Sequence, residues 1–333
     1  MRRETPGPRR RFRPSAVVHT ALATTLLAAG LTSDAVRSGV DALVGTADIL
    51  DEAGGESGKD LERVDIPPSR GSTDEDGTAG ARRDLRLAEA IAPLLDAPSA
   101  EGTRLSVAIC ALGSGQSAVY GSDLFDTASI VKVDILAALL LLAQDEGREL
   151  TAEEKSLAGV MIRQSDNDAA DTLWRAIGGA DGLDAANERL GLTRTAGGPE
   201  AHWGLTQTTS EDQLALLSAV YGTTSPLSAQ SRAFVQDLMA TVVDGQRWGV
   251  SAAADEAAFE LKNGWLPRSQ TGLWDINSIG RVTADGEQYL VAVVSDGHVT
   301  QAAGITAVEA AAEAAVGALT TDEGATTEPG SVV

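Results

Sequence analysis

The chain has 333 residues, 43% of them hydrophobic, and a formal net charge of −22 at pH 7. This acidity argues against a nucleic-acid partner, because binding phosphates requires clustered lysines and arginines. A single cysteine, Cys110, excludes a disulfide within the chain, and only three histidines are present, so we expect no metal and no cofactor.

Residues 1–33 have the character of an export signal or an N-terminal anchor. Six arginines precede the apolar, alanine-rich stretch 16–31, which is short for a membrane span and typical of a signal sequence. The run Arg9-Arg10-Arg11-Phe12 resembles a twin-arginine (Tat) signal, and a Sec signal or an uncleaved anchor are the alternatives. We therefore expect a secreted or cell-envelope protein that meets the membrane only through this segment, if it is not cleaved.

Residues 34–83 are acidic, rich in glycine and other turn-forming residues, and poor in large apolar groups. Such a segment cannot bury enough surface to fold by itself, so we predict a disordered acidic linker. Residues 84–320 follow as one domain, large enough for a sizeable core, and residues 321–333 as a disordered tail. We expect the protein to be a monomer.

Within residues 84–320, hydrophobic periodicity and turn signals predict the secondary structure in chain order. The predicted helices cover residues 84–96, 130–143, 151–164, 168–178, 182–190, 211–221, 229–243 and 306–319. The predicted strands cover residues 105–111, 116–120, 258–265, 274–283 and 288–295. This order predicts an α+β fold, with a five-stranded antiparallel sheet flanked by the terminal helices and a separate helical lobe.

Ser129 and Lys132 stand at the head of an almost unbroken apolar run, residues 130–143. Residues three apart on a helix lie on one face, so these two side chains can meet. A lysine inside an apolar helix loses its hydration, which lowers its pKa and suits it to take the proton of the Ser129 hydroxyl. Taken alone, Ser129 is equally consistent with a helix N-cap, and Lys132 with a side chain that reaches the surface.

Two more motifs follow, Ser165-Asp166-Asn167 between two predicted helices and Lys262-Asn263-Gly264 on a predicted strand. In this order the three motifs resemble the S-x-x-K, S-D-N and K-T-G set of the penicillin-recognising serine hydrolases, most closely the class A β-lactamase-like group. The resemblance covers residues 84–320. It implies an α/β/α sandwich of the class A β-lactamase/transpeptidase type and an acyl-enzyme formed on Ser129.

The resemblance also implies a role for each matching residue. Ser129 would be the nucleophile, Lys132 its base, and Ser165 the hydroxyl that passes a proton to the leaving nitrogen. Asp166 would be structural. Substrate binding would fall to Asn167 at the amide, Lys262 and Asn263 at a carboxylate, Gly264 through close backbone approach, and the Trp265 N–H as second oxyanion donor beside that of Ser129.

The sequence departs from the family pattern at the residue that releases the acyl group. Class A enzymes carry a loop glutamate in an E-x-x-x-N pattern, which has no counterpart between residues 167 and 262. Glu200 is the only glutamate in the corresponding loop and is our candidate, with His202 as an alternative. Asn263 stands where Thr or Ser is usual, which puts carboxylate recognition in question, and Arg268 is a further candidate for that role.

We therefore predict an enzyme: a secreted serine hydrolase of the class A β-lactamase-like type that cleaves β-lactams or related amides. Its partner is expected to be a small-molecule β-lactam or a cell-wall peptide. Two alternatives stay open. One is a penicillin-binding D-alanyl peptidase that acts on cell-wall peptides, and the other is a catalytically weak extracellular binding or sensor domain on the same fold.

Overall fold

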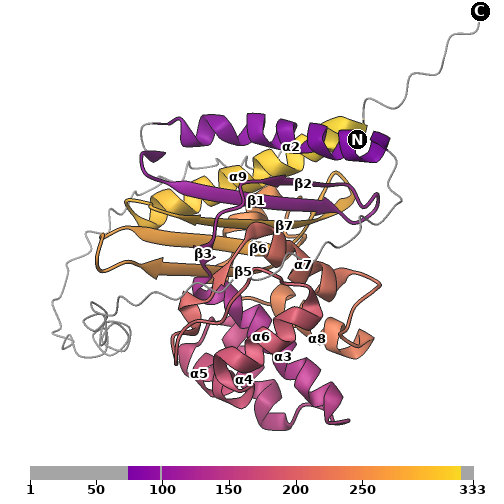
Figure 1. Ribbon diagram of the computed structural model, residues 1–333, viewed down its shortest axis with the longest axis vertical. Coiled ribbons are helices and arrows are strands. Elements are labelled where there is room, and N and C mark those ends of the chain that lie inside the picture. Colours follow the sequence, from indigo (N-terminus) through magenta and orange to yellow (C-terminus); the bar gives the residue numbers. More distant parts are fainter. Residues whose placement is uncertain (1–73, 98–99, 324–333) are drawn as a thin grey trace, which may run out of the picture. The chain divides into compact units, whose positions relative to one another are not determined.

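The computed structural model describes residues 74–97 and 100–323. The predicted export signal, the linker as far as residue 73 and the tail from residue 324 lie outside the described residues. The elements below keep the labels of Figure 1.

One antiparallel sheet lies at the centre of the domain. Its strands are β1 (Arg104–Ala111), β2 (Ser117–Tyr120), β5 (Phe259–Pro267), β6 (Trp274–Ala284) and β7 (Glu287–Asp296). They are arranged in the order β2-β1-β7-β6-β5, and every neighbouring pair is antiparallel (Figure 1). A second, two-stranded sheet pairs β3 (Phe125–Asp126) with β4 (Gln207–Thr208). The predicted five-stranded antiparallel sheet is confirmed.

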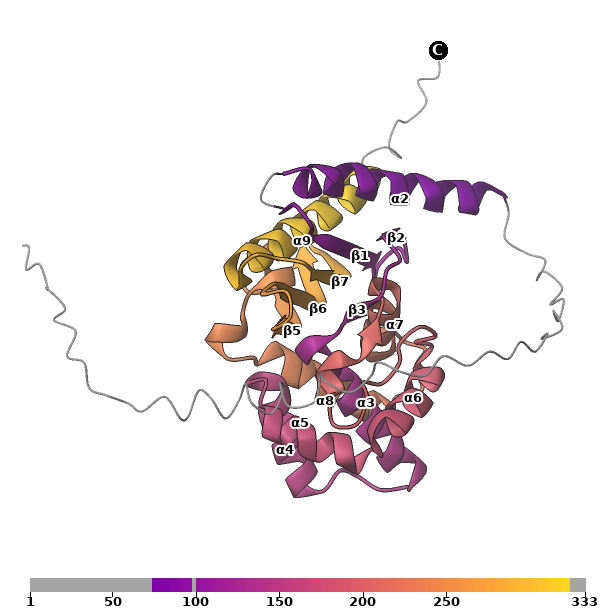
Figure 2. The same ribbon diagram turned by 60° about the vertical axis from the view of Figure 1, so that its left-hand side comes forward.

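The helices form two groups, one on each face of the five-stranded sheet (Figures 1 and 2). On one face lie α2 (Asp74–Leu95) and α9 (Gln301–Glu323). On the other lies the helical lobe, made of α3 (Val131–Asp145), α4 (Ala152–Arg163), α5 (Asn167–Ala176), α6 (Gly179–Leu190), α7 (Ser210–Tyr221) and α8 (Ala229–Ala240). Short 3-10 turns are η2 (Ala128–Ile130), η3 (Trp203–Leu205), η4 (Asp244–Gln246) and η5 (Gly249–Ala253).

Alternate residues of β7 point into two separate cores. Leu290, Ala292 and Val294 belong to the core of the helical lobe, whereas Val291 and Val293 belong to the core beneath α2 and α9. Successive side chains of a strand point to opposite faces, so an uninterrupted apolar strand is buried on both. A slip of one residue would exchange the two cores, which fixes the register of the sheet.

The domain begins earlier in the chain than we predicted, because α2 includes residues 74–83, which we had assigned to the linker. Arg83 Nε donates to the Ser117 carbonyl oxygen at 3.0 Å, and Asp84 Oδ1 accepts from the Val119 N–H at 2.8 Å. These bonds join α2 to the edge strand β2. Tertiary contacts therefore order a segment whose acidic, glycine-containing composition favours disorder.

Helix α9 also extends beyond its predicted end, to Glu323, inside the predicted tail. Among the described residues, its segment Gln301–Thr320 is the one helix long and apolar enough to cross a membrane by length and composition alone. Val308, Ala311 and Ala312 are fully buried in the core beneath the sheet. Packing in this core accounts for the apolar composition of α9.

Helix α3 carries two residues with ionisable side chains, Lys132 and Asp134, that are fully buried. Neither carboxyl oxygen of Asp134 has a hydrogen-bond partner among the described residues. Burial raises the pKa of Asp134 to about 8, and the nearby backbone N–H of Asp134 and side chain of Gln213, which form no hydrogen bond of good geometry with it, oppose the rise only in part. Asp134 is therefore mostly neutral in the folded protein at pH 7.

Replacing Asp134 with Asn should remove a pH dependence of stability. The folded protein keeps this proton up to about pH 8, whereas the unfolded chain releases it near the ordinary pKa of 3.8. The wild type therefore loses stability as the pH rises between these values, by roughly 1.4 kcal/mol per pH unit from this group. Urea unfolding at several pH values from 5 to 8 should show a smaller loss in Asp134→Asn. Asp145→Asn, at the exposed end of the same helix, is the matched control, and equal slopes in all three proteins would contradict this account.

Candidate active site

Ser129 lies at a sharp turn between strand β3 and helix α3. Ala128, directly before it, has a φ of 47°, in the left-handed region that alanine rarely adopts. Such strain persists only where the surrounding structure fixes it, and it is frequent at functional sites. The turn places Ser129 in the 3-10 turn that opens the helix, where backbone N–H groups lack a helical acceptor and carry partial positive charge.

Lys132 is fully buried one turn after Ser129. Its Nζ lies 3.0 Å from Ser129 Oγ and 2.7 Å from both Asn167 Oδ1 and the Ser165 carbonyl oxygen. All of these are neutral oxygen atoms. Burial lowers the pKa of Lys132 to about 7, and two nearby aspartates oppose this shift only in part. A large fraction of Lys132 is therefore neutral at pH 7 and able to accept a proton from Ser129.

Ser165 joins the two lysines of the site. It lies between α4 and α5 with a φ of 59°, and its Oγ is 3.2 Å from Lys132 Nζ and 3.0 Å from Lys262 Nζ. The next residue, Asp166, is the N-cap of α5, because its Oδ1 accepts from the Ala169 N–H at 2.8 Å. This cap fixes the start of α5 and so the position of Ser165.

Lys262 reaches the site from β5, the edge strand beside the helical lobe. Its side chain is 1% exposed, and Nζ donates to the carbonyl oxygen of Asn263 at 2.7 Å. Burial, together with the nearby charge of Lys132, holds the pKa of Lys262 well below its ordinary value. A substrate carboxylate next to Lys262 would supply the counter-charge that the buried ammonium group lacks.

Gly264 and Trp265 lie where β5 passes the turn around Ser129. A Cβ atom on Gly264 would lie 2.8 Å from both the Ser129 nitrogen and the Thr127 carbonyl oxygen, so no side chain fits there. Trp265 follows, and its ring centroid lies 6.1 Å from that of Trp248. Because β5 is an edge strand, its open side carries unpaired backbone groups next to Ser129.

Asn263 does not face the site, contrary to our prediction. Its side chain is fully buried, and Nδ2 donates to the carbonyl oxygens of Gln246 at 2.7 Å and Trp248 at 2.9 Å. Its Oδ1 accepts from Ser278 Oγ at 2.6 Å. Neighbouring side chains of a strand point to opposite faces, so Lys262 and Asn263 cannot both point to the site. Asn263 instead fastens β5 to the segment before η5.

The loop between α6 and α7 carries both candidates for the deacylating base. Glu200 is exposed with a φ of 51°, and its backbone oxygen accepts from Trp174 Nε1 at 3.0 Å. His202 Nδ1 lies 3.3 Å from the Pro199 carbonyl oxygen. Among the described residues, neither side chain forms a hydrogen bond with the other predicted site residues, so the structure does not bring them into the network around Ser129.

Trp203, from the same loop, lies beside Lys132, which the sequence did not predict. Lys132 Nζ is 4.7 Å from the centroid of the Trp203 ring, and Trp203 Nε1 donates to Asp171 Oδ1 at 2.7 Å. The aromatic face covers one side of the lysine and contributes to its dehydration. A tryptophan in a glycine-containing loop was the only sequence signal, and it identified no partner.

Arg268 lies beyond β5, apart from the network around Ser129. Its guanidinium contacts Asp126, and its Nη1 lies 3.4 Å from Asp275 Oδ2, so it already has two carboxylate partners. Nor do acidic side chains gather for a metal: across residues 74–97 and 100–323, no group of three His, Cys, Asp or Glu residues is arranged to hold one.

Solved structures of class A β-lactamases share this fold. A class A β-lactamase from Bacteroides cellulosilyticus DSM 14838 superposes with a TM-score of 0.62 at 18% identity, covering 72% of this chain and 99% of the other. A mutant of PBP-A, in an acyl-enzyme complex with penicillin G, gives a TM-score of 0.60 at 22% identity, covering 71% and 97%. At these identities the likeness shows the fold alone, and it confirms the predicted fold class.

Sequence comparison extends the likeness. The protein named "Putative lipoprotein LppW" of Mycobacterium tuberculosis (strain ATCC 25618 / H37Rv) is 30% identical over 179 residues, which are 51% of this chain and 57% of LppW. The chain thus spans little more than half of this relative's length. A model described as "Beta-lactamase enzyme family" matches residues 144–319, a stretch that begins after Ser129 and Lys132 and includes Ser165 and Lys262. Because this match covers more than half of the sequence, the chain belongs to the beta-lactamase enzyme family.

Proposed function

We propose that this protein is a serine hydrolase that opens a β-lactam or a related amide through an ester on Ser129. The observation that carries the proposal is the continuous set of contacts Ser129–Lys132–Ser165–Lys262. In it a buried lysine, which has no carboxylate partner within residues 74–97 and 100–323, lies 3.0 Å from a serine hydroxyl. This arrangement supplies a nucleophile, a base and a route for the proton.

In the proposed acylation step, neutral Lys132 takes the proton of Ser129 as Oγ attacks the carbonyl carbon. The tetrahedral oxyanion accepts hydrogen bonds from the N–H groups of Ser129, which lies close to Gly264, and of Trp265, the residue after Gly264 on β5. The carbon–nitrogen bond then breaks. The proton passes from Lys132 through Ser165 Oγ to the leaving nitrogen, since that hydroxyl lies within 3.2 Å of the lysine.

Asn167 and Lys262 would each bind one polar group of the substrate. Asn167 is exposed at the start of α5, and its Oδ1 contacts Lys132 at 2.7 Å, which leaves the amide NH₂ group to bind a substrate carbonyl. Lys262 binds the substrate carboxylate and gains charge as it does so. A water molecule then hydrolyses the ester and regenerates Ser129.

A penicillin-binding D-alanyl peptidase is the second candidate, because one observation favours slow release of the acyl group. Among the described residues, no carboxylate forms a hydrogen bond with Ser129 or Lys132, and the Trp203 ring covers Lys132 at 4.7 Å. A water next to the ester would therefore lack a carboxylate base. Such an enzyme would hold its acyl group for long periods and would act on cell-wall peptides.

We place this activity outside the cytoplasm, in the cell envelope or secreted. The arginine-rich, apolar N-terminal stretch supports export, and the relative LppW is named as a lipoprotein. The proposed substrates, β-lactams and cell-wall peptides, occur in the same compartment. The proposed chemistry needs no cofactor, since the base and the oxyanion donors all come from this chain.

Incubation with a chromogenic cephalosporin, followed by absorbance and intact mass, tests the proposal. We expect the mass of the wild type to rise by one acyl group and the adduct to be absent in Ser129→Ala, because that variant lacks the nucleophile. Rapid colour favours β-lactamase turnover, and a persistent adduct favours the peptidase. An adduct in Ser129→Ala would contradict the assignment of the nucleophile, and neither signal in the wild type would favour the binding or sensor domain.

The rate of acylation should rise with pH and level off above about pH 7. Only the neutral form of Lys132 accepts a proton, and its pKa is about 7 in the folded protein. Stopped-flow measurement of the acylation rate at pH 5 to 9 checks this. Lys132→Arg, which stays protonated throughout, should lose roughly 10²-fold or more, the usual contribution of a general base. A profile that stays flat in the wild type would contradict a neutral Lys132.

Trp203→Glu should accelerate loss of the acyl group if the second candidate is right. The substitution puts a carboxylate next to Lys132 and the ester, where it can activate water, and a gain of roughly 10²-fold is the usual contribution of such a base. The same carboxylate raises the pKa of Lys132 and should slow acylation, so release is measured separately, on adduct that has already formed. The decay of the mass adduct measures this rate. Trp203→Gln is the matched control, because it opens the same space without a base. Equal decay in the two variants would argue that missing base chemistry does not limit release.

A further inference from the structure

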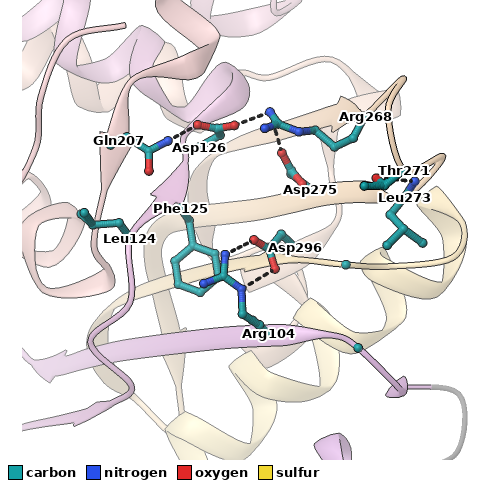
Figure 3. A pocket seen from close by; sticks show the side chains of 12 residues that line it. Arg104, Leu124, Phe125, Asp126, Gln207, Arg268, Thr271, Leu273, Asp275 and Asp296 are labelled. Carbon is teal, nitrogen blue, oxygen red and sulfur yellow. Dashed lines mark hydrogen bonds and ion pairs between the residues drawn. The ribbon is translucent and has the colours of Figure 1, made fainter. Parts of the chain in front are cut away.

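A charged cavity of about 370 Å³ lies at the end of the sheet, lined by residues of β1, β3, β4, β6 and β7 and of the loop between β5 and β6 (Figure 3). Leu124, Phe125 and Leu273 form apolar parts of its lining. Gln207 and Thr271 add neutral polar groups, and five charged side chains complete the wall: Arg104, Asp126, Arg268, Asp275 and Asp296. No role in the proposed acylation falls to any of these side chains.

The charges around this cavity do not cancel. Arg104 forms two hydrogen bonds with Asp296, one of them from Nε to Oδ1 at 3.1 Å, so these two side chains satisfy each other. Arg268 is the nearest cation to both Asp126 and Asp275, and Asp126 also accepts a hydrogen bond from Gln207 Nε2 (Figure 3). The described side chains of the cavity thus hold three carboxyl groups and two guanidinium groups, so one carboxyl group lacks a cation of its own when all three are ionised.

Of the three carboxyl groups in the cavity, that of Asp275 has the fewest partners. It is 4% exposed, and among the described residues its carboxylate has no hydrogen bond and only the ion pair with Arg268 at 3.4 Å. Burial raises the pKa of Asp275 to about 7, and Arg268 opposes that rise only in part. A buried carboxylate gains most from a donor that brings charge and hydrogen bonds together, as a primary ammonium group does with its three N–H donors.

The cavity lies next to the candidate active site along the chain. Asp126 precedes Ser129 by three residues, and Arg268 follows Trp265 by three. Three residues of extended chain span about 10 Å at most, so Asp126 lies within about 10 Å of Ser129, and Arg268 within about 10 Å of Trp265. Along β5, Lys262 contacts Ser165, Gly264 passes Ser129, and the strand then ends at the cavity, so the cavity lies on the side of Ser129 away from Ser165.

We propose that this cavity binds a primary ammonium group at the end of the acyl side chain of the substrate, through Asp275 with support from Asp126. The proposal rests on the function above, in which Ser165 marks the leaving-group side of the scissile bond. The opposite side of Ser129 then receives the acyl portion. The substrate class is an amide or β-lactam whose acyl chain carries an amine about 10 Å from the reacting carbonyl.

Two penicillins test this specificity, one with a 6-aminohexanoyl side chain and one with the same chain acetylated on its terminal nitrogen. They match closely in reach and differ in charge. We expect the second-order rate constant of acylation to be about tenfold higher for the free amine, the gain typical of one charge-assisted hydrogen bond. In Asp275→Asn the ratio should fall to about one. Equal rate constants for the two probes in the wild type would overturn the proposal.

A second variant changes the ratio in the opposite direction. Arg268→Gln removes the cation that competes with the ligand for Asp126 and Asp275, so the preference for the free amine should increase when it is measured at pH 9, which favours the ionised carboxylates while the probe stays an ammonium ion. General damage to the fold would instead slow both probes alike and leave the ratio unchanged. Asp237→Asn, on the exposed surface of α8, is the charge-matched control for Asp275→Asn and should keep the wild-type ratio. A reduced preference in Arg268→Gln would contradict ammonium binding at these carboxylates.

Binding without chemistry separates this proposal from the proposed function. If neither penicillin is hydrolysed and neither forms an adduct, acylation at Ser129 is wrong, and the cavity is tested by calorimetry with the free-amine probe and the Ser129→Ala protein. The proposal is supported if the free-amine probe binds about tenfold more tightly than the acetylated probe and if this difference disappears when Asp275→Asn is added. Equal affinity for the two probes overturns it whatever the outcome at Ser129.

Discussion

The burial of the Lys132 ammonium group, with only neutral oxygen atoms hydrogen-bonded to it among the described residues, is the constraint on which the candidate site depends. Desolvation without a counter-charge favours the neutral amine, and the Trp203 ring excludes water from one side. A second buried lysine, Lys262, shares Ser165 Oγ with it. Two positive charges are unfavourable so close together, so the site favours release of a proton and uptake of an anion.

The sheet supplies the rigidity that this arrangement requires. Asn277 of β6 donates to the carbonyl oxygens of Asp126 and Thr127, which holds the segment before Ser129 against the sheet. Asn263 fastens β5 from its far side, through bonds that its buried amide satisfies completely. The left-handed turn ahead of Ser129 is thus fixed by contacts outside the site, as strained backbone generally must be.

Much of this could be predicted from the sequence, because the decisive signals are local. The apolar periodicity of the strands and the three short motifs predicted the sheet, the helical lobe, and the meeting of Ser129 with Lys132, Ser165 and Lys262. The errors concern long-range contacts. Asn263 points away from the site because its hydrogen-bond partners lie fifteen or more residues away in the chain. The contact of Trp203 with Lys132 and the cavity around Asp275 likewise have no local sequence pattern that would predict them. The order of residues 74–83 likewise depends on tertiary contacts with β2.

The pKa of Lys132 in the folded protein tests the central claim most directly. Protein labelled with ¹³C at the lysine ε carbon can be titrated by NMR, and the Lys132 signal assigned from its loss in Lys132→Arg. This signal should titrate near pH 7, because Lys132 is buried and no carboxylate in the described part of the chain is hydrogen-bonded to it. A titration at the ordinary lysine value of 10.5 would show that Lys132 stays charged, and Ser129 would then lack its base.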